Sequence, residues 1–308
     1  MTELLRRSEL ALPACNDHMF AKGVSCGADL VFLDLEDATP VGLKVESRAK
    51  AIRALTELDW GRTARAVRIN ALDTPWCHDD IIEVVTHAGA QLDTLVIPKV
   101  RTARELWWVD VLLTQLEEKL GLSRRIRLEV LIEEVEGLAN AEEIVRSSSR
   151  LDAVIFGVGD FSLSQGARVD TNFVPITDYP GDFWAYARNK IMVAARIAGI
   201  DAIDSPYPDY ADVAGYEAEA RRSSLYGYTG KWAIHPSQVP IANEVFAPTP
   251  EEIALAQRNI EAYRAAEAAG RGATGVDGVL VDAAHVKKAE EVLARAALID
   301  GQLVPVDG

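Results

Sequence analysis

The chain has 308 residues, of which 47 are Asp or Glu and 32 are Lys or Arg, giving a formal net charge of −15. Such an acidic chain lacks the basic face that nucleic acids and anionic membranes require, so neither is expected as a partner. Its three cysteines include no Cys-x-x-Cys pair, so neither a disulfide framework nor a structural zinc site is expected. No apolar run approaches the roughly 18 residues of a membrane span, and the first residues do not form a signal peptide, so a cytoplasmic protein is expected.

Short apolar segments rich in Val, Ile and Leu recur along the chain, and each is predicted to be a strand buried on both faces. The eight predicted strands cover residues 10–14, 29–37, 64–70, 94–100, 127–135, 152–161, 199–206 and 229–236. Between them the apolar period predicts amphipathic helices over residues 44–58, 102–120, 138–149, 183–198 and 209–225. Eight alternating units favour an α/β fold of the (β/α)8 TIM-barrel type over the alternative, a doubly wound open sheet.

Two segments fall outside this repeat. Residues 162–179 are predicted to be a long loop after the sixth strand, and loops of that length are often functional. The chain then ends in a predicted helix (251–269), a Gly-rich turn (270–278), a short strand (279–281) and a last helix (284–297). We therefore expect a catalytic barrel, residues 1–247, and a C-terminal extension, residues 248–308, that acts as a lid or packs on a neighbouring subunit.

Polar side chains collect where the predicted strands end. Enzymes built on such barrels carry their chemistry at the carboxyl ends of the strands. Burying these groups without partners would be costly, so they are expected to meet a ligand, a metal or one another. They are Asp34, Glu36, Asp37, Arg68, Asn70, Lys99, Glu133, Glu134, Asp160, Asp204 and His235.

Glu133 and Asp160 follow neighbouring strands and can reach a common point above the barrel. Mg²⁺ is typically held by one or two carboxylates, with water and substrate oxygens as the other ligands, and no His–Cys cluster offers a site for a softer metal. The alternative is an inert buried network in which these carboxylates pair with Lys99 or Arg68. Spacing alone leaves both interpretations open.

The guanidinium of Arg68 suits a carboxylate or enolate oxygen because it offers two parallel hydrogen bonds, but it can equally form an ion pair with Glu36 or Asp37. The Gly-Val-Gly stretch at 157–159 lets backbone N–H groups approach a ligand carboxylate closely, and it is also compatible with a tight turn. The residues expected to bind substrate are Arg68, Gly157, Val158, Gly159, Glu36 and Asp37.

The chain resembles the citrate lyase β-subunit / malyl-CoA lyase family, most closely its malyl-CoA lyases. The resemblance covers nearly the whole chain. It is carried by RRSELALPA (6–14), GADLVFLDLEDA (27–38), a K-x3-R pair at Lys44 and Arg48, VRINALDTP (67–75), VIPKV (96–100), LIEEVEGLANAEEI (131–144), GVGDFSLSQG (157–166), GKWAIHPSQVPIANEVFAP (230–248) and GVLVDAAHVKKAEEVL (278–293).

The resemblance implies roles for individual residues. Glu133 and Asp160 would hold Mg²⁺, with Mn²⁺ as a substitute, and Arg68 would face the reacting acid. Asp282 would be the acid/base carboxylate, supplied to a neighbouring subunit's active site within a homotrimer or homohexamer. The alternative for Asp282 is a helix N-cap before Ala283.

The resemblance places coenzyme A near residues of the last strand and of the segment after the first strand, namely Lys22, Trp232, Ala233 and Ile234. Two departures from the family bear on this. Residues 14–18 read ACNDH where many relatives have a Gly-Pro-Gly-Ser-Arg-like loop, and Glu134 stands where many have Thr or Ser. The expectations that depend most on these two departures are the contacts to the CoA phosphates and the identity of the substrate.

The resulting hypothesis is a Mg²⁺-dependent carbon–carbon lyase that cleaves malyl-CoA or β-methylmalyl-CoA, reversibly, to glyoxylate and acetyl-CoA or propionyl-CoA. Asp282 and Arg68 are the expected catalytic residues, and an acyl-CoA and a 2-oxo acid are the expected partners. The alternatives are a citramalyl-CoA lyase, a citrate lyase β-subunit-like enzyme, a malyl-CoA thioesterase, or a catalytically silent subunit of a larger complex.

Overall fold

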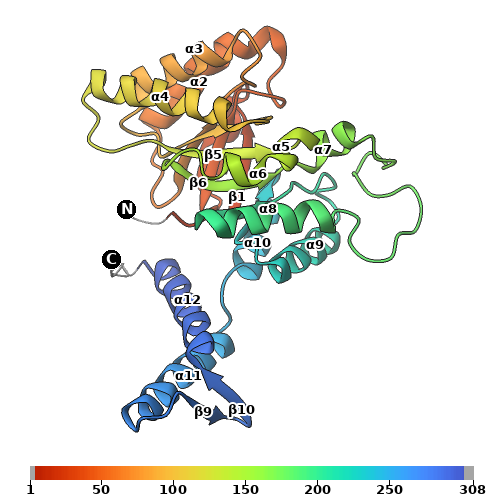
Figure 1. The fold of residues 1–308 in the computed structure, drawn as a ribbon. Coiled ribbons are helices and arrows are strands. Elements are labelled where there is room, and N and C mark those ends of the chain that lie inside the picture. The colour runs from red at the N-terminus through yellow and green to blue at the C-terminus, as the bar shows by residue number, and fades with distance from the viewer. Residues whose placement is uncertain (1–3, 302–308) are drawn as a thin grey trace. The chain divides into compact units, whose positions relative to one another are not determined.

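A computed structural model describes residues 4–301, and the chain falls into two compact units. The larger unit, Arg6–Phe246, is a closed barrel of eight parallel strands in sequence order, so the predicted TIM barrel is confirmed and the open sheet is wrong (Figure 1). Its strands are β1 (Ser8–Pro13), β2 (Leu30–Asp34), β3 (Ala64–Arg68), β4 (Thr94–Ile97), β5 (Arg127–Ile132), β6 (Leu151–Phe156), β7 (Asp201–Asp204) and β8 (Gly230–Ala233).

Most strands are shorter than predicted. Strand β2 ends at Asp34, β4 at Ile97 and β5 at Ile132, each three residues before the predicted end. The apolar strand cores are buried, as a parallel sheet covered on both faces requires. The polar residues that were predicted to end the strands therefore lie mainly on the loops that follow them.

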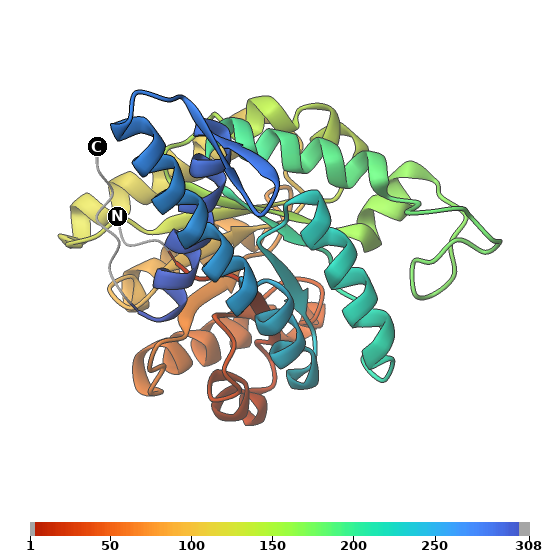
Figure 2. The same ribbon diagram turned by 90° about the horizontal axis from the view of Figure 1, so that it is seen from below.

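The helices of the larger unit lie outside its ring of strands (Figures 1 and 2). The largest are α2 (Lys44–Glu57), α3 (Cys77–Ala88), α4 (Ala103–Leu120), α8 (Ala185–Ala198) and α9 (Val213–Tyr226). Helix α4 begins in a capping box of Thr102 and Glu105 and ends at Gly121, whose φ of 64° suits a glycine. The shorter helical segments are η1 (Asp17–Met19), α1 (Phe20–Val24), η2 (Val41–Leu43), α5 (Val135–Ala139), α6 (Ala141–Ile144), α7 (Val158–Gln165), η3 (Pro236–Gln238) and α10 (Val239–Val245).

Two predictions for this region are wrong, and one helix was missed. Helix α3 was not predicted, although its apolar residues recur at helical spacing and bury one face. The single helix predicted over 138–149 is two short helices, α5 and α6, separated at Asn140. Residues 158–165 form α7 instead of the end of a strand and the start of a loop, because the backbone turns at Gly157 and leaves the sheet. The long connection that remains, from Gly166 to the start of α8, extends away from the barrel wall (Figures 1 and 2).

Buried charge also lies at the amino-terminal end of the strands. Arg6 donates a hydrogen bond to Glu129 at 2.6 Å, while Glu9 is fully buried and 3.9 Å from the same guanidinium. Burial raises the pKa of Glu9 well above its ordinary value, and the neighbouring carboxylate of Glu129 adds to the effect. This end of the barrel carries a structural network, because in TIM-barrel enzymes the chemistry sits at the opposite face.

The second unit comprises the chain from Ala247 onward together with residues 4–5. It contains α11 (Pro250–Ala268), β9 (Ala273–Val276), β10 (Val279–Asp282) and α12 (Ala283–Ile299). Helix α11 starts in a capping box of Thr249 and Glu252, with Pro250 at its first position. The expected Gly-rich turn contains β9, which pairs antiparallel with β10. The predicted outer boundaries at residues 1 and 308 lie outside the described residues. Within residues 4–301, no helix has the length and apolar character needed to cross a membrane.

Candidate active site

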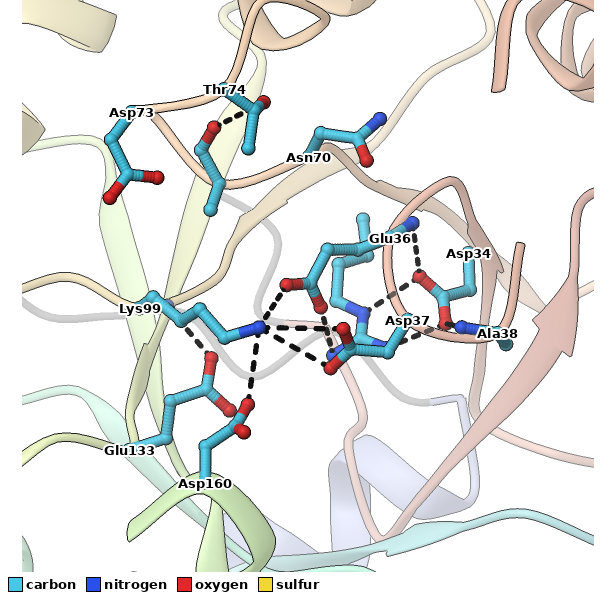
Figure 3. A network of polar contacts seen from close by, with 12 residues as sticks. Asp34, Glu36, Asp37, Ala38, Asn70, Asp73, Thr74, Lys99, Glu133 and Asp160 are labelled. Atoms are coloured by element: carbon cyan, nitrogen blue, oxygen red, sulfur yellow. Dashed lines mark hydrogen bonds and ion pairs between the residues drawn. The ribbon is translucent and has the colours of Figure 1, made fainter. Parts of the chain in front are cut away.

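Five neighbouring segments place charged side chains at the carboxyl end of the barrel. Figure 3 shows Lys99 between two groups of carboxylates, with Glu36 and Asp37 on one side and Glu133 and Asp160 on the other. The contributing positions are the end of β2 (Asp34) and the two acids after it, the end of β3 (Arg68), the loop after β4 (Lys99), the residue after β5 (Glu133) and the first turn of α7 (Asp160). Asp160 is therefore a helix residue, not the strand-end residue that was predicted.

Arg68 is held rigidly. Its Nε and Nη2 donate to the two carboxylate oxygens of Asp34 at 2.8 and 2.6 Å, and its Nη1 lies 3.0 Å from Glu36. The guanidinium also lies over the Trp232 ring, 5.0 Å from its centre. The predicted ion pair with Glu36 is confirmed, but the main partner is Asp34. A buried guanidinium fixed on two sides presents its remaining surface in one orientation, as a binding site for an anionic oxygen requires.

Glu133 is almost fully buried, with 3% exposure. Burial raises its pKa to about 8, although Arg68 and a hydrogen bond from the backbone N–H of Lys99 (2.8 Å) oppose the shift. A carboxylate in this position is poorly compensated by the surrounding protein. Such a group either holds a proton or binds a cation.

Gly157 makes room for Glu133. A Cβ atom at position 157 would lie 2.5 Å from both Cβ and Oε2 of Glu133, closer than real Cβ contacts allow. The φ of Gly157 is −98°, which any residue adopts, so the reason for glycine here is space and not backbone freedom.

A Gly157→Ala variant is expected to displace the carboxylate of Glu133, which the sequence predicts to be a Mg²⁺ ligand. Because metal affinity depends on ligand placement, Mg²⁺ binding is expected to weaken by about tenfold or more. Isothermal titration with MgCl₂ measures this. The matched control is Gly159→Ala, whose Cβ would meet only the Phe173 ring, at 3.1 Å or more. Equal effects of the two substitutions would contradict the specific role of Gly157.

Asp160 is more accessible than Glu133, with 30% of its side chain exposed, and its Oδ2 lies 3.2 Å from Lys99 Nζ. The same Nζ lies 2.5 Å from Glu36 and 3.4 Å from Asp37. The pairing that was the alternative to a metal site is thus present for Asp160. Within residues 4–301 no group of three or more His, Cys, Asp or Glu side chains forms a metal site. Two carboxylates with open positions for water and substrate nevertheless suit Mg²⁺.

The Gly-Val-Gly stretch at 157–159 forms the start of α7, with Gly157 at the N-cap position. The N–H groups in the first turn of an α-helix lack intrahelical partners and can bind an anion. The sequence predicted backbone N–H donors at 157–159, but at the end of a strand and not at the start of a helix. Asp160 lies in the same first turn, so the free N–H groups and a carboxylate side chain lie next to each other.

Two basic residues that support the site belong to the family resemblance, but no role was predicted for them from the sequence. Lys44 is buried, and its Nζ donates to the carbonyl oxygens of Leu35 and Glu36 at 2.9 and 2.7 Å. One turn further along α2, Arg48 binds Asp80, which in turn accepts from the backbone N–H of Asn70 at 2.9 Å. These two contacts hold the loops after β2 and β3. The available signal was a pair of basic residues at i and i+4, spaced to share one face of that helix.

The residues expected near coenzyme A differ in burial: Trp232 and Ala233 are buried, whereas Lys22 is exposed. Trp232 is 5% exposed and packs edge-to-face on Phe32, with ring centres 4.9 Å apart, and its ring lies beneath the guanidinium of Arg68. Its Nε1 has no hydrogen-bond partner among the described residues. Ala233 is fully buried, the backbone N–H of Ile234 donates to Gln238, and Lys22 is exposed on α1.

Asp282 is the N-cap residue of α12, as its alternative interpretation predicted. Its carboxylate accepts from the backbone N–H groups of Ala284 and His285 at 3.0 and 3.3 Å, and it lies 2.7 Å from His285 Nδ1. The hydrogen bond with His285 lowers the pKa of Asp282. The side chain remains 46% exposed, so it can still meet a ligand or another chain.

The sequence pattern of the HpcH/HpaI aldolase/citrate lyase family matches residues 7–236. The chain belongs to this family. Aldolases and citrate lyases break carbon–carbon bonds, so the predicted class of reaction and the resemblance that led to it are both confirmed.

Individual members of the HpcH/HpaI family give closer comparisons. An L-malyl-CoA/β-methylmalyl-CoA lyase of Cereibacter sphaeroides is 40% identical over 302 residues, covering 95% of each chain. A (3S)-malyl-CoA thioesterase of the same species is 33% identical over 293 residues, again covering 95% of each. The crystal structure of CitE from Mycobacterium tuberculosis, in complex with magnesium, acetoacetate and coenzyme A, is 28% identical, with a TM-score of 0.74 and coverage of 95% of this chain and 98% of that one.

Proposed function

We propose that the protein is a Mg²⁺-dependent lyase that cleaves malyl-CoA or β-methylmalyl-CoA to glyoxylate and acetyl-CoA or propionyl-CoA, and that also runs the reverse condensation. The observation that carries the proposal is the juxtaposition of a fixed guanidinium, Arg68, with two carboxylates, Glu133 and Asp160, at the carboxyl end of the barrel. The malyl-CoA lyase relative at 40% identity supports the substrate class.

Glu133 and Asp160 would hold the Mg²⁺ ion, or Mn²⁺ in its place. When bound, the metal supplies a Lewis acid for the carbonyl oxygen of the 2-oxo acid and a template for its two oxygens. The first-turn N–H groups at 157–159 bind the carboxylate of the same acid, and Glu36 and Asp37 border the substrate beside Lys99.

Cleavage breaks the bond between the α and β carbons of the acyl group. The hydroxyl proton leaves with a base, and the electron pair of the broken bond passes to the thioester as an enolate. Arg68 stabilises the developing negative charge, because Asp34 and Glu36 hold it in place before the reaction. Asp282 delivers a proton to the enolate carbon as a general acid and removes it in the condensation.

The coenzyme A moiety would lie along Trp232, Ala233 and Ile234, with the exposed ammonium of Lys22 near its phosphates. We place Asp282 in the active site of a neighbouring subunit, within a homotrimer or homohexamer in the cytoplasm. The C-terminal unit would then be the arm that carries Asp282 from one subunit to the next.

The test is a Mg²⁺-supplemented assay that pairs acetyl-CoA or propionyl-CoA with glyoxylate, pyruvate or oxaloacetate and identifies products by mass. We expect condensation with glyoxylate. A preference for pyruvate would indicate a citramalyl-CoA lyase instead, and no reaction with any pair would overturn the lyase proposal.

A second candidate, hydrolysis of malyl-CoA, is favoured by one observation, the 33% identity to a thioesterase over 95% of the chain. The site proposed to stabilise the enolate could also support hydrolysis of the thioester, in which water attacks the carbonyl carbon and the CoA thiol leaves. Release of free thiol from malyl-CoA, with malate and without glyoxylate, would decide for the hydrolase.

A further inference from the structure

Lys99 contacts carboxylates on both sides of the candidate metal site. Its backbone N–H donates to Glu133 Oε1 at 2.8 Å, and its Nζ lies 3.2 Å from Asp160 Oδ2. The same Nζ lies 2.5 Å from Glu36 and 3.4 Å from Asp37 (Figure 3). One residue therefore connects both proposed metal ligands to the acidic pair that follows β2.

The backbone of Lys99 is strained. Its φ is 53°, and within residues 4–301 only Phe173 and Asp277 share a positive φ among residues other than glycine. L-amino acids with a side chain avoid this region, and such conformations persist where the surroundings impose them, often at functional sites. Here the conformation accompanies a backbone contact to Glu133 and side-chain contacts to the other three carboxylates.

The ammonium of Lys99 and the guanidinium of Arg68 have different partners. Arg68 binds Asp34 with two hydrogen bonds and reaches Glu36 with its third nitrogen. Among residues 4–301, Asp37 and Asp160 form ion pairs only with Lys99. An ammonium is a compact point charge with rotatable donors, so it can occupy a place among several carboxylates that a divalent ion also suits.

We propose that Lys99 is a built-in counter-ion that competes with Mg²⁺ for Asp160: its ammonium neutralises Asp160 in the metal-free site and gives that carboxylate up when the metal binds. This proposal rests on the metal site proposed above. It makes Lys99 a positioning residue, not a metal ligand.

The ion pair between Lys99 and Glu36 is stronger than the ion pair between Lys99 and Asp160. The contact with Glu36 is short, and Glu36 is only 4% exposed, so breaking this ion pair would leave Arg68 as the one cation paired with a buried carboxylate. The contact with Asp160 is longer, and that carboxylate is 30% exposed to water, where ion pairs are weak and easily exchanged. The ammonium therefore remains on Glu36 while Asp160 becomes available to the metal.

The test measures Mg²⁺ binding by calorimetry in the full-length protein without substrate. Lys99→Met removes the charge but keeps the chain length, and Lys99→Gly removes the charge and relieves the positive φ while retaining the N–H that Glu133 accepts. Both are expected to bind Mg²⁺ roughly threefold to tenfold more tightly than the wild type, because the competitor is gone. Lys99→Arg keeps the charge and is expected to stay nearer the wild-type affinity.

Weaker or unchanged binding in both Lys99→Met and Lys99→Gly would overturn the proposal, because it would show that the lysine assembles the carboxylates or takes no part. Asp160→Asn separates this failure from that of the metal site itself. If Asp160→Asn abolishes binding, the metal site stands whatever the Lys99 variants do. If it leaves binding intact, the metal site is elsewhere and the Lys99 proposal fails with it.

Discussion

A Glu133→Gln variant is expected to lose Mg²⁺-dependent turnover by about 10³-fold and yet to be more stable than the metal-free wild type at pH 9. The loss of turnover follows because a neutral amide replaces one of the two carboxylates that we propose as Mg²⁺ ligands, and with it the electrostatic stabilisation that the metal would supply. The gain in stability follows from burial. Glu133 is 3% exposed, and its pKa is raised from 4.5 to about 8, so its ionised form is unfavourable in the folded metal-free protein.

The direction of the pH effect follows from linkage. A carboxyl group with a raised folded-state pKa contributes stability that is fully present below its unfolded pKa and is lost as the pH rises through the folded value. The window for Glu133 is therefore about pH 4.5 to 8, and ionisation costs the wild type up to about 5 kcal/mol by pH 9. Glutamine has no such cost, so the free energy of unfolding of the variant falls less between pH 6 and pH 9.

Urea unfolding of both metal-free proteins at pH 6 and pH 9 measures the difference. Adding Mg²⁺ at pH 9 should restore the wild type and leave Glu133→Gln unchanged. The matched control is Glu134→Gln, because Glu134 is a neighbouring acid, 29% exposed and 3.7 Å from Arg101. Parallel pH profiles for wild type and Glu133→Gln would show that Glu133 is not the buried ionisable group we describe.

The barrel itself was predictable because its strands are buried on both faces. That burial demands continuous apolar runs such as LVFLD at 30–34, and eight such runs alternate with helical patterns. The strand ends were not predictable, because they depend on where pairing stops. At 152–161 the apolar run continues past Phe156, yet the chain leaves the sheet at Gly157 and enters α7.

The composition of the site was predictable in part for a topological reason. Parallel strands bring their carboxyl ends to one face, so Arg68, Glu133 and Asp160 meet there whatever the details of packing. The partners of each side chain depend on rotamers and loop geometry, which sequence does not report. The sequence offered Glu36 or Asp37 as partners of Arg68, and the structure confirms Glu36 but makes Asp34 the main partner. The sequence gave no sign of the positive φ at Lys99.

Replacing Asp282 by Asn is expected to abolish turnover while leaving α12 intact. Asparagine is as good an N-cap as aspartate, so the hydrogen bonds from Ala284 and His285 to the side-chain oxygen can be kept. What disappears is the ionisable carboxylate that we propose as the proton carrier. We expect turnover to fall by about 10²- to 10⁴-fold, the range for loss of a general acid, with Mg²⁺ affinity unchanged. A variant as active as the wild type would remove Asp282 from the mechanism.

Mixing two inactive variants tests whether Asp282 serves a neighbouring subunit. Oligomers assembled at equal amounts from Asp282→Asn and Glu133→Gln chains contain some sites that combine an intact barrel from one chain with an intact arm from the other. If the arm crosses between subunits, random assembly restores about one quarter of the wild-type activity. If Asp282 acts on its own barrel, every site carries one of the two defects and the mixture stays inactive. Recovery of activity would therefore assign the C-terminal unit to the neighbouring active site, because no single chain in the mixture carries both intact carboxylates.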